Sequence, residues 1–362
     1  MITNPFRYAI FVGKIINPTG EIYKNAFIVV NKGKIEKISY DWEGPYVDFS
    51  HSTATPGFIE PYSHVGFSRR FLENGTTIDF SKVILDPEIN AFDGINYSDP
   101  AIRDAREFGV TTIYTSSTNK VLRLATGLVA KTLVSQTLKG STYKNKIIEI
   151  YLEGPDEYYE SDMRMYIISK IRTLYRDSAK FKSVFMSANR ILVVANSSEA
   201  IEAALNLAEE LKIIDKITIV GGVEAIKLAS YLREMKIPVV YGPFWISDPL
   251  YLDRWNFNNV VRMYKEGICV SLSTFHPIID IKLLQLTPAL AIRYDLNEKE
   301  ATTIFSINSA KALGIDNKVG SIEARKDADI VVWEEDAFDM KEGIRDVYIN
   351  GIRVNRLVSI PL

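Results

Sequence analysis

The most diagnostic segment of the chain is Pro56-Gly57-Phe58-Ile59-Glu60-Pro61-Tyr62-Ser63-His64-Val65-Gly66. An apolar stretch follows a proline and a glycine here, which predicts a strand over Gly57–Tyr62. Polar and aromatic side chains come at the end of that strand. In barrels of parallel strands, residues at the carboxyl ends of the strands form the site. We therefore expect Tyr62 and His64 to lie at the mouth of a site.

Strand-like and helix-like segments alternate on either side of this motif, from about residue 56 to residue 319. Repeated β-α units over roughly 250 residues predict an α/β fold, a (β/α)8 TIM barrel. An eighth strand could lie in Lys182–Met186, where a helix is equally consistent. Ser198 is a candidate cap for one of the helices. The seven clearer strands are Gly57–Tyr62, Val110–Thr115, Ile147–Leu152, Ile191–Ala195, Ile217–Val220, Pro238–Tyr241 and Ile268–Ser273.

Both ends of the chain instead show short strands separated by turn residues. The first 40 residues contain three such strands, with Asn17-Pro18-Thr19-Gly20 between the first two. Near the other end, Asn350-Gly351 is a typical hairpin turn. We therefore predict a small β-sandwich domain made by residues 1–55 and 320–362. It would flank a barrel of residues 56–319.

Composition and charge exclude several classes of function. The chain has 362 residues, with 43 Lys+Arg against 45 Asp+Glu, and its net charge of -2 predicts neither nucleic-acid nor membrane binding. The single cysteine, Cys269, rules out an internal disulfide and is typical of a reducing compartment. The first residues show no signal peptide, and no segment has the ~20 apolar residues of a membrane span. These features predict a cytoplasmic protein.

Four segments resemble motifs of the amidohydrolase superfamily, and the nearest branch is similar to imidazolonepropionases. The opening motif resembles P-G-F-I-D-x-H-x-H-x-G, and Ala105–Thr112 resembles A-x-x-x-G-V-T-T. Asn308–Gly314 is similar to N-P-A-K-x-L-G, and Val319–Trp333 is similar to G-S-I-E-x-G-K-D-A-D-L-V-V-W. The resemblance covers nearly the whole chain. It implies a distorted TIM barrel with a β-sandwich built from both termini.

The resemblance also implies a divalent metal, held by histidines and an aspartate, that activates water. The chain has only three histidines. Tyr62 stands at the family's first His, His64 at its second, and Phe275, in Ser273-Thr274-Phe275-His276-Pro277, at its closing Asp. Val194 and Gly221 stand near the other two His positions. The carboxylate of Glu153 resembles that of the L-E-G-P motif.

Only His64 and Glu153 therefore remain as candidate metal ligands, whereas a zinc site takes at least three protein ligands. We expect no metal cofactor, or zinc only if the site has been rebuilt. Further candidates for ligand binding are Tyr62, His276 and Arg69. Each has a plain structural alternative: His276 could cap a loop, Glu153 could anchor one, and Arg69 could belong to an exposed face.

These observations leave three hypotheses for function. The first is a catalytically degenerate relative of hydrolases that cleave non-peptide (cyclic amide) C–N bonds, which binds a small molecule or a partner at the barrel mouth. The second is an active hydrolase with a rebuilt site, in which His64, Glu153, His276 and Asp156 or Asp248 supply the ligands or base. The third is a structural subunit of a complex. A homodimer is expected in each case.

Overall fold

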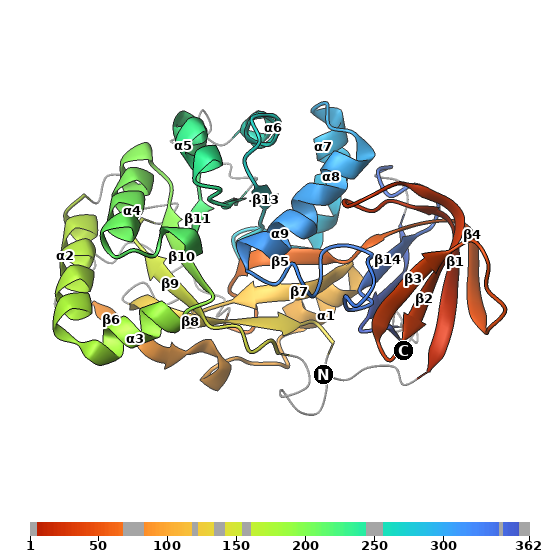
Figure 1. The fold of residues 1–362 in the computed structure, drawn as a ribbon, viewed down its shortest axis with the longest axis horizontal. Helices are drawn as coiled ribbons and strands as arrows, with labels where there is room; N and C mark the ends of the chain where they lie inside the picture. Colours follow the sequence, from red (N-terminus) through yellow and green to blue (C-terminus); the bar gives the residue numbers. More distant parts are fainter. Residues whose placement is uncertain are drawn as a thin grey trace, which may run out of the picture.

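The computed structural model describes residues 6–67, 83–117, 122–133, 142–153, 161–243, 256–339 and 343–354, without the side chains of residues 122 and 123. Within these ranges the chain forms a barrel of eight strands surrounded by helices, and a separate sheet to one side (Figure 1). The sequence prediction of a distorted TIM barrel with a terminal β domain is confirmed at this level. None of the helices described is long and apolar enough to cross a membrane.

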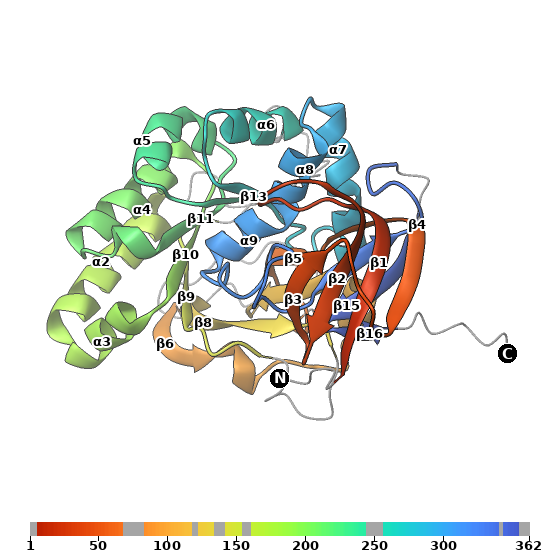
Figure 2. The ribbon, with the colours of Figure 1, turned by 45° about the vertical axis from the view of Figure 1, so that its right-hand side comes forward.

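The separate sheet combines strands from both parts of the chain, as Figure 2 shows. Its order is β16-β15-β14-β4-β1-β2-β3, and the central pairing is between β4 and β14. The sheet buries an apolar face that includes Ile10, Ile28 and Val332. Its strands are β1 (Arg7–Ile15), β2 (Tyr23–Asn31), β3 (Lys34–Ser39), β4 (Tyr46–Pro56), β14 (Ile330–Trp333), β15 (Ile344–Ile349) and β16 (Ile352–Val354).

The barrel sheet has the order β13-β12-β11-β10-β9-β8-β7-β5, and β6 (Ile84–Asn90) pairs with β8 outside that path. All seven clear strand predictions correspond to observed strands. Of the two alternatives left open for Lys182–Met186, the helix is the one observed, because this segment lies in α3, and the eighth strand lies elsewhere. The barrel strands are β5 (Phe58–Ser63), β7 (Val110–Thr115), β8 (Leu122–Lys131), β9 (Ile147–Tyr151), β10 (Arg190–Ala195), β11 (Ile217–Gly221), β12 (Val239–Tyr241) and β13 (Val270–Leu272).

The strand that the sequence did not reveal, β8, also departs from the regular barrel pattern. It runs antiparallel to both neighbours, β7 and β9, whereas β9 to β13 are mutually parallel. A search for repeated strand-helix units passes over such a strand, because only six residues separate it from the end of β7. The distortion of the barrel is therefore concentrated at β8.

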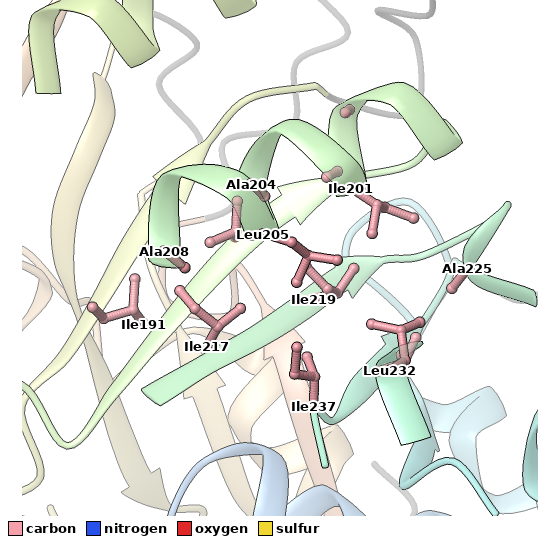
Figure 3. Close-up of a cluster of buried hydrophobic side chains, with 14 of the residues drawn as sticks. Ile191, Ile201, Ala204, Leu205, Ala208, Ile217, Ile219, Ala225, Leu232 and Ile237 are labelled. Carbon is pink, nitrogen blue, oxygen red and sulfur yellow. The ribbon is translucent and has the colours of Figure 1, made fainter. Parts of the chain in front are cut away.

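Helices cover the outside of the barrel and bury one apolar stripe each. In α4, Ile201, Ala204, Leu205 and Ala208 pack against the strands β10 and β11 (Figure 3). Its cap is Ser197, one residue before the predicted Ser198, and the Ser197 hydroxyl accepts from Ala200 N. The helices are α1 (Pro100–Glu107), α2 (Ser161–Asp177), α3 (Ala179–Ser187), α4 (Ser198–Glu210), α5 (Ala229–Glu234), α6 (Phe257–Lys265), α7 (Thr287–Arg293), α8 (Glu298–Phe305) and α9 (Ile307–Ala312). The short 3-10 helices are η2 (Ala91–Asp93), η4 (Ile214–Lys216), η5 (Ala225–Leu228) and η6 (Ile281–Leu286).

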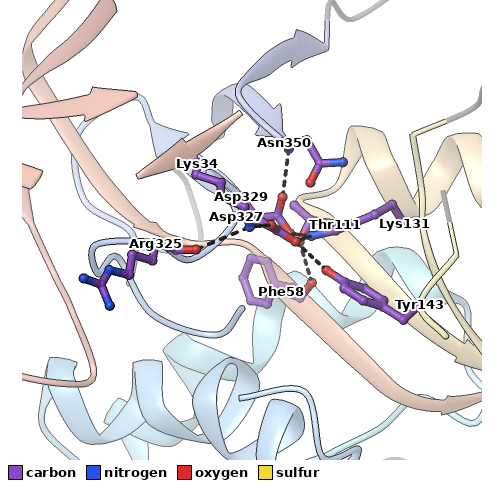
Figure 4. Close-up of polar contacts among 9 residues, drawn as sticks. All are labelled: Lys34, Phe58, Thr111, Lys131, Tyr143, Arg325, Asp327, Asp329 and Asn350. Atoms are coloured by element: carbon purple, nitrogen blue, oxygen red, sulfur yellow. Dashed lines mark hydrogen bonds and ion pairs between the residues drawn. The ribbon is translucent and has the colours of Figure 1, made fainter. Parts of the chain in front are cut away.

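A buried cluster of charges joins the barrel to the terminal sheet (Figure 4). Lys131, at the end of β8, is fully buried and forms ion pairs with Asp327 (3.3 Å) and Asp329. Asp327 also accepts from the Tyr143 hydroxyl at 2.8 Å, and Asp329 accepts from Asn350 N at 2.9 Å. Both aspartates come from Lys326-Asp327-Ala328-Asp329, so this C-terminal motif holds the two parts of the fold together.

Candidate functional site

Inside the barrel, a buried carboxylate is bound by two tyrosines. Tyr62 on β5 donates its hydroxyl to Glu149 Oε1 at 2.9 Å, and Tyr114 on β7 donates to Glu149 Oε2 at 2.8 Å. Glu149 lies on β9, and both tyrosines are completely buried. Burial, followed by the negative charge of Glu149, raises the pKa of both phenols well above the usual value. Both therefore remain protonated donors.

Phe275 packs directly against this group. Its ring centroid lies 4.6 Å from that of Tyr62. The Tyr114 ring stacks on the Tyr62 ring, with 5.8 Å between their centroids. Phe275 is buried and has a φ of 51°, an uncommon conformation for a bulky residue. Its N–H donates to Ser273 Oγ at 3.1 Å, which helps to hold the turn that points the ring inward. The positions of Tyr62 and Phe275, distant in sequence, thus meet as the expected site requires.

The two histidines predicted at the site are brought together. His64 N donates to the His276 carbonyl oxygen at 2.8 Å, and the His64 ring lies 5.4 Å from that of Tyr62. His64 Nδ1 lies 3.1 Å from the Ser116 carbonyl oxygen, which favours the tautomer protonated on Nδ1. Burial lowers the pKa of both imidazoles, so both are neutral near pH 7. His276 Nδ1 has no hydrogen-bond partner in the part of the chain that the structure describes.

Glu153 has a different role in the structure from a free ligand. Its carboxylate accepts from Asn196 N (3.2 Å), Ser197 N (2.9 Å) and Ser197 Oγ (2.8 Å) at the start of α4. A carboxylate is favoured at this position by the helix dipole and the free N–H groups. Glu153 thus anchors the start of α4. This corresponds to the structural alternative considered from the sequence, in which Glu153 anchors a loop.

The side chain of Asn196 fills the space beside Gly221. A Cβ atom on Gly221 would lie 2.2 Å from Asn196 Oδ1, and Gly221 has a φ of 92°. Asn196 Oδ1 makes no hydrogen bond in the described structure, although Nδ2 donates to the Glu153 carbonyl oxygen at 3.3 Å. Val194, the other position compared with a family histidine, is fully buried on β10.

Three residues considered from the sequence cannot be assessed in this way. Arg69, Asp156 and Asp248 lie outside the described residues. His51, the third histidine, is exposed on β4 in the terminal sheet. The described part of the candidate site therefore consists of Tyr62, His64, Glu149, Phe275 and His276.

Comparisons with known proteins agree with the fold and with the motifs. A model of the amidohydrolase family matches residues 254–354. The chain is 25% identical to an imidazolonepropionase of Thermoplasma volcanium, with 90% of this chain and 91% of that protein covered. It is 23% identical to the imidazolonepropionase of Picrophilus torridus, with 92% and 93% covered. The crystal structure of an amidohydrolase from Thermotoga maritima superposes with a TM-score of 0.82 at 27% identity, covering 96% of this chain and all of that one.

The chain is similar to proteins of the amidohydrolase superfamily along most of its length, in sequence and in fold. It resembles imidazolonepropionases at low identity. A molinate hydrolase structure, with a TM-score of 0.62 at 14% identity, shares the fold alone.

The superfamily implies a divalent metal, and the residues of this chain can be tested against one. Among the residues described, no three His, Cys, Asp or Glu side chains are grouped so that they could hold a metal ion. The Tyr62 hydroxyl is bonded to Glu149, and the Glu153 carboxylate accepts three hydrogen bonds from α4. Within the described ranges, the donors at this site do not fit the three or four nitrogen and oxygen ligands of a zinc site.

Sequence reasoning missed four buried polar residues near the site: Glu60, Tyr114, Glu149 and Asn196. One signal was available. Glu149 stands alone within Ile147-Ile148-Glu149-Ile150, and Glu60 follows Phe58-Ile59. A carboxylate inside an apolar strand is seldom buried without partners, which points to a polar group within the barrel.

Proposed function

We propose that this protein does not perform the metal-dependent hydrolysis of its superfamily, and that it binds a small molecule or a partner at the barrel mouth. One observation carries the proposal. Tyr62 and Phe275, at the positions compared with the first His and the closing Asp, pack ring against ring at 4.6 Å. A phenyl ring can neither coordinate a metal nor accept a proton from water. The Tyr62 hydroxyl is already bonded to Glu149.

The surroundings of these rings support the same proposal. Asn196 fills the space beside Gly221, so a histidine at that position would collide with it. The carboxylate of Glu153 is engaged by the start of α4. Each position compared with a family ligand, apart from His64, thus has a packing or anchoring role.

The relatives suggest which ligands to try first. Two of the most similar curated proteins are named imidazolonepropionases. We infer that a small ring bearing amide N–H and C=O groups is the first class to test. Neutral His64 and His276 near the barrel mouth could exchange hydrogen bonds with such a ring, because an imidazole offers one donor and one acceptor.

The metal content of the purified protein tests directly whether the metal-dependent hydrolysis has been lost. We expect far less than one metal ion per chain by mass spectrometry, in protein purified without an affinity tag and incubated with zinc, manganese and iron. The reason is that, among the described residues, no three His, Cys, Asp or Glu side chains are grouped so that they could hold a metal ion. The same preparation should not hydrolyse cyclic amides. One tightly bound metal per chain together with such hydrolysis would contradict the proposal.

A hydrolase with a rebuilt site remains the second candidate, because His276 Nδ1 has no hydrogen-bond partner among the described residues and His64 lies beside His276. Under our proposal, the natural protein, His64→Ala and the control His51→Ala on the terminal sheet all fail to hydrolyse cyclic amides. An activity that survives His51→Ala and disappears in His64→Ala would favour the rebuilt site. Steady-state rates on the purified variants decide between the two.

A further inference from the structure

Glu60, a carboxylate that the proposed function does not use, lies where the barrel closes. No strand ladder joins β5 to β13 in the described residues, although these are the two ends of the barrel sheet. The gap is spanned mainly by side chains. Glu60 on β5 contacts Ser273 Oγ, Thr274 N (3.1 Å) and Thr274 Oγ1 (2.7 Å), which follow β13. All three residues are fully buried.

Counting protons shows which form of Glu60 this arrangement requires. Ser273 Oγ lies 2.6 Å from the Tyr62 carbonyl oxygen and also contacts Glu60 Oε1. A hydroxyl has one proton to donate, and a carbonyl oxygen can only accept. The Ser273 proton therefore goes to Tyr62 O, and the contact between Ser273 and Glu60 needs a proton from Glu60. If Glu60 is a neutral acid, its proton goes to Ser273 Oγ and the Ser273 proton goes to the Tyr62 carbonyl oxygen. If Glu60 is a carboxylate, either its Oε1 or the Tyr62 carbonyl oxygen receives no proton from Ser273.

We propose that Glu60 is a proton-operated latch: as a neutral acid it closes the barrel between β5 and β13, and loss of its proton loosens that closure. The latch consists of Glu60, Ser273 and Thr274. Without the proton, the Ser273 hydroxyl can serve Glu60 or the Tyr62 carbonyl but not both. A negative charge would also be buried without a counter-ion among the described residues that bind Glu60.

The two sides of the closure carry the candidate site. Tyr62 and His64 follow Glu60 on one side, and Phe275 and His276 follow Thr274 on the other. They meet through the backbone bond from His64 N to His276 O and the ring contact of Tyr62 with Phe275. Loosening the latch would therefore change the relative positions of His64 and His276 at the barrel mouth.

The charged groups near Glu60 in the described structure do not offer another explanation for a pH effect at the latch. Its neighbours in the latch are neutral, and β7 and β13 carry no charged residue. The other elements packed against β5 are α8, α9 and η6. Their charged side chains have partners elsewhere or are exposed: Glu298 pairs with Lys14, Lys299 with Gly20 O, Glu300 with Asn297, Lys282 with Asp280 and Asp104, and Lys311 is exposed.

The direction of the pH effect follows from burial. Burial raises the pKa of Glu60 to about 7, although the bonds from Ser273 and Thr274 oppose the shift. A carboxyl whose pKa is higher in the folded protein stabilises it at low pH, and this contribution is lost as pH rises to about 7. His64 and His276 act oppositely, because burial lowers their pKa. A variant at Glu60 is therefore needed to isolate its effect.

The test compares urea unfolding of the full chain at pH 6 and pH 8. Glu60→Gln is always neutral, and its amide can donate to Ser273 Oγ as the acid does. We expect the urea midpoint of the natural protein to fall from pH 6 to pH 8 and that of Glu60→Gln to fall less than half as much. Ser273→Ala should lower the midpoint more at pH 6 than at pH 8. Equal pH dependence in the natural protein and Glu60→Gln would overturn the proposal.

Imidazole NMR signals measure the coupling to the barrel mouth. The chain has three histidines, and His51, on the terminal sheet, is an internal control. We expect the His64 and His276 signals to show an inflection near pH 7 that is absent in Glu60→Gln, while the His51 signal is the same in both proteins at each pH. A difference in urea midpoints without this inflection would mean that Glu60 does not move the barrel mouth, which also overturns the latch.

Discussion

Replacing Lys131 by methionine is expected to lower the free energy of unfolding by about 3–5 kcal/mol, the usual result of removing one partner from a buried ion pair. The Lys131 ammonium is fully buried and lies against both Asp327 and Asp329. Methionine fills a similar volume without the charge. In the described structure, the Asp329 carboxylate would then keep the hydrogen bond from Asn350 N but no ion pair. Urea unfolding at pH 7 measures the loss.

Lys34→Met is the matched control. Lys34 also pairs with Asp327, at 2.9 Å, but its side chain is 54% exposed. Pairs of this kind contribute about 0–1 kcal/mol. A loss for Lys131→Met no larger than that for Lys34→Met would contradict the assigned role of Lys131.

The pH dependence of the Lys131 variant has a definite sign. Burial raises the pKa of Asp329, and Lys131 opposes that shift. Removing Lys131 should raise this pKa further. Since a carboxyl with a raised pKa destabilises the folded protein as pH rises, the deficit of Lys131→Met should shrink between pH 7 and pH 5.

The second large effect is expected at Gly221. Gly221→Ala should destabilise the protein by roughly 2–5 kcal/mol, the sum of about 1–2 kcal/mol for left-handed backbone and about 1–3 kcal/mol for overpacking. The new Cβ atom would lie 2.2 Å from Asn196 Oδ1, and φ is 92°. Asn196 is fully buried and cannot turn away without breaking its bond to the Glu153 carbonyl oxygen.

Two variants separate these contributions. Gly20 has a φ of 84°, but a Cβ there meets no atom within 4 Å, so Gly20→Ala measures backbone strain alone. The double variant Asn196→Ala with Gly221→Ala removes the obstructing oxygen and should recover part of the loss. Equal losses for Gly20→Ala and Gly221→Ala would show that Asn196 yields easily. That result would weaken the case against a histidine at residue 221.

The sequence predicted the fold well where strand and helix alternate. Apolar runs bounded by turns identified seven barrel strands, and the N- and C-terminal motifs identified the composite sheet. It failed at β8, because an antiparallel strand carries no helix-strand period to mark it. It left Lys182–Met186 undecided, because the apolar residues of this segment suit a strand as well as the observed helix α3.

The candidate site was predictable only in outline. The positions of Tyr62, His64 and Phe275 could be read from the motifs, and the structure brings them together. The hydrogen bonds from Tyr62 and Tyr114 to Glu149 could not, because they join β5, β7 and β9 through contacts that no local pattern encodes. The proton that Glu60 requires follows from the Ser273 geometry alone.

The pairing of β4 with β14 sets an order for folding in the cell. β4 ends at Pro56 and β14 begins at Ile330, so the first half of the terminal sheet leaves the ribosome long before its partner strand has been translated. Until then β4 presents an unpaired edge, a template for association with other chains. Contacts so distant in sequence also slow folding. Nascent chains stalled before Ile330 should therefore depend on chaperones more than completed ones.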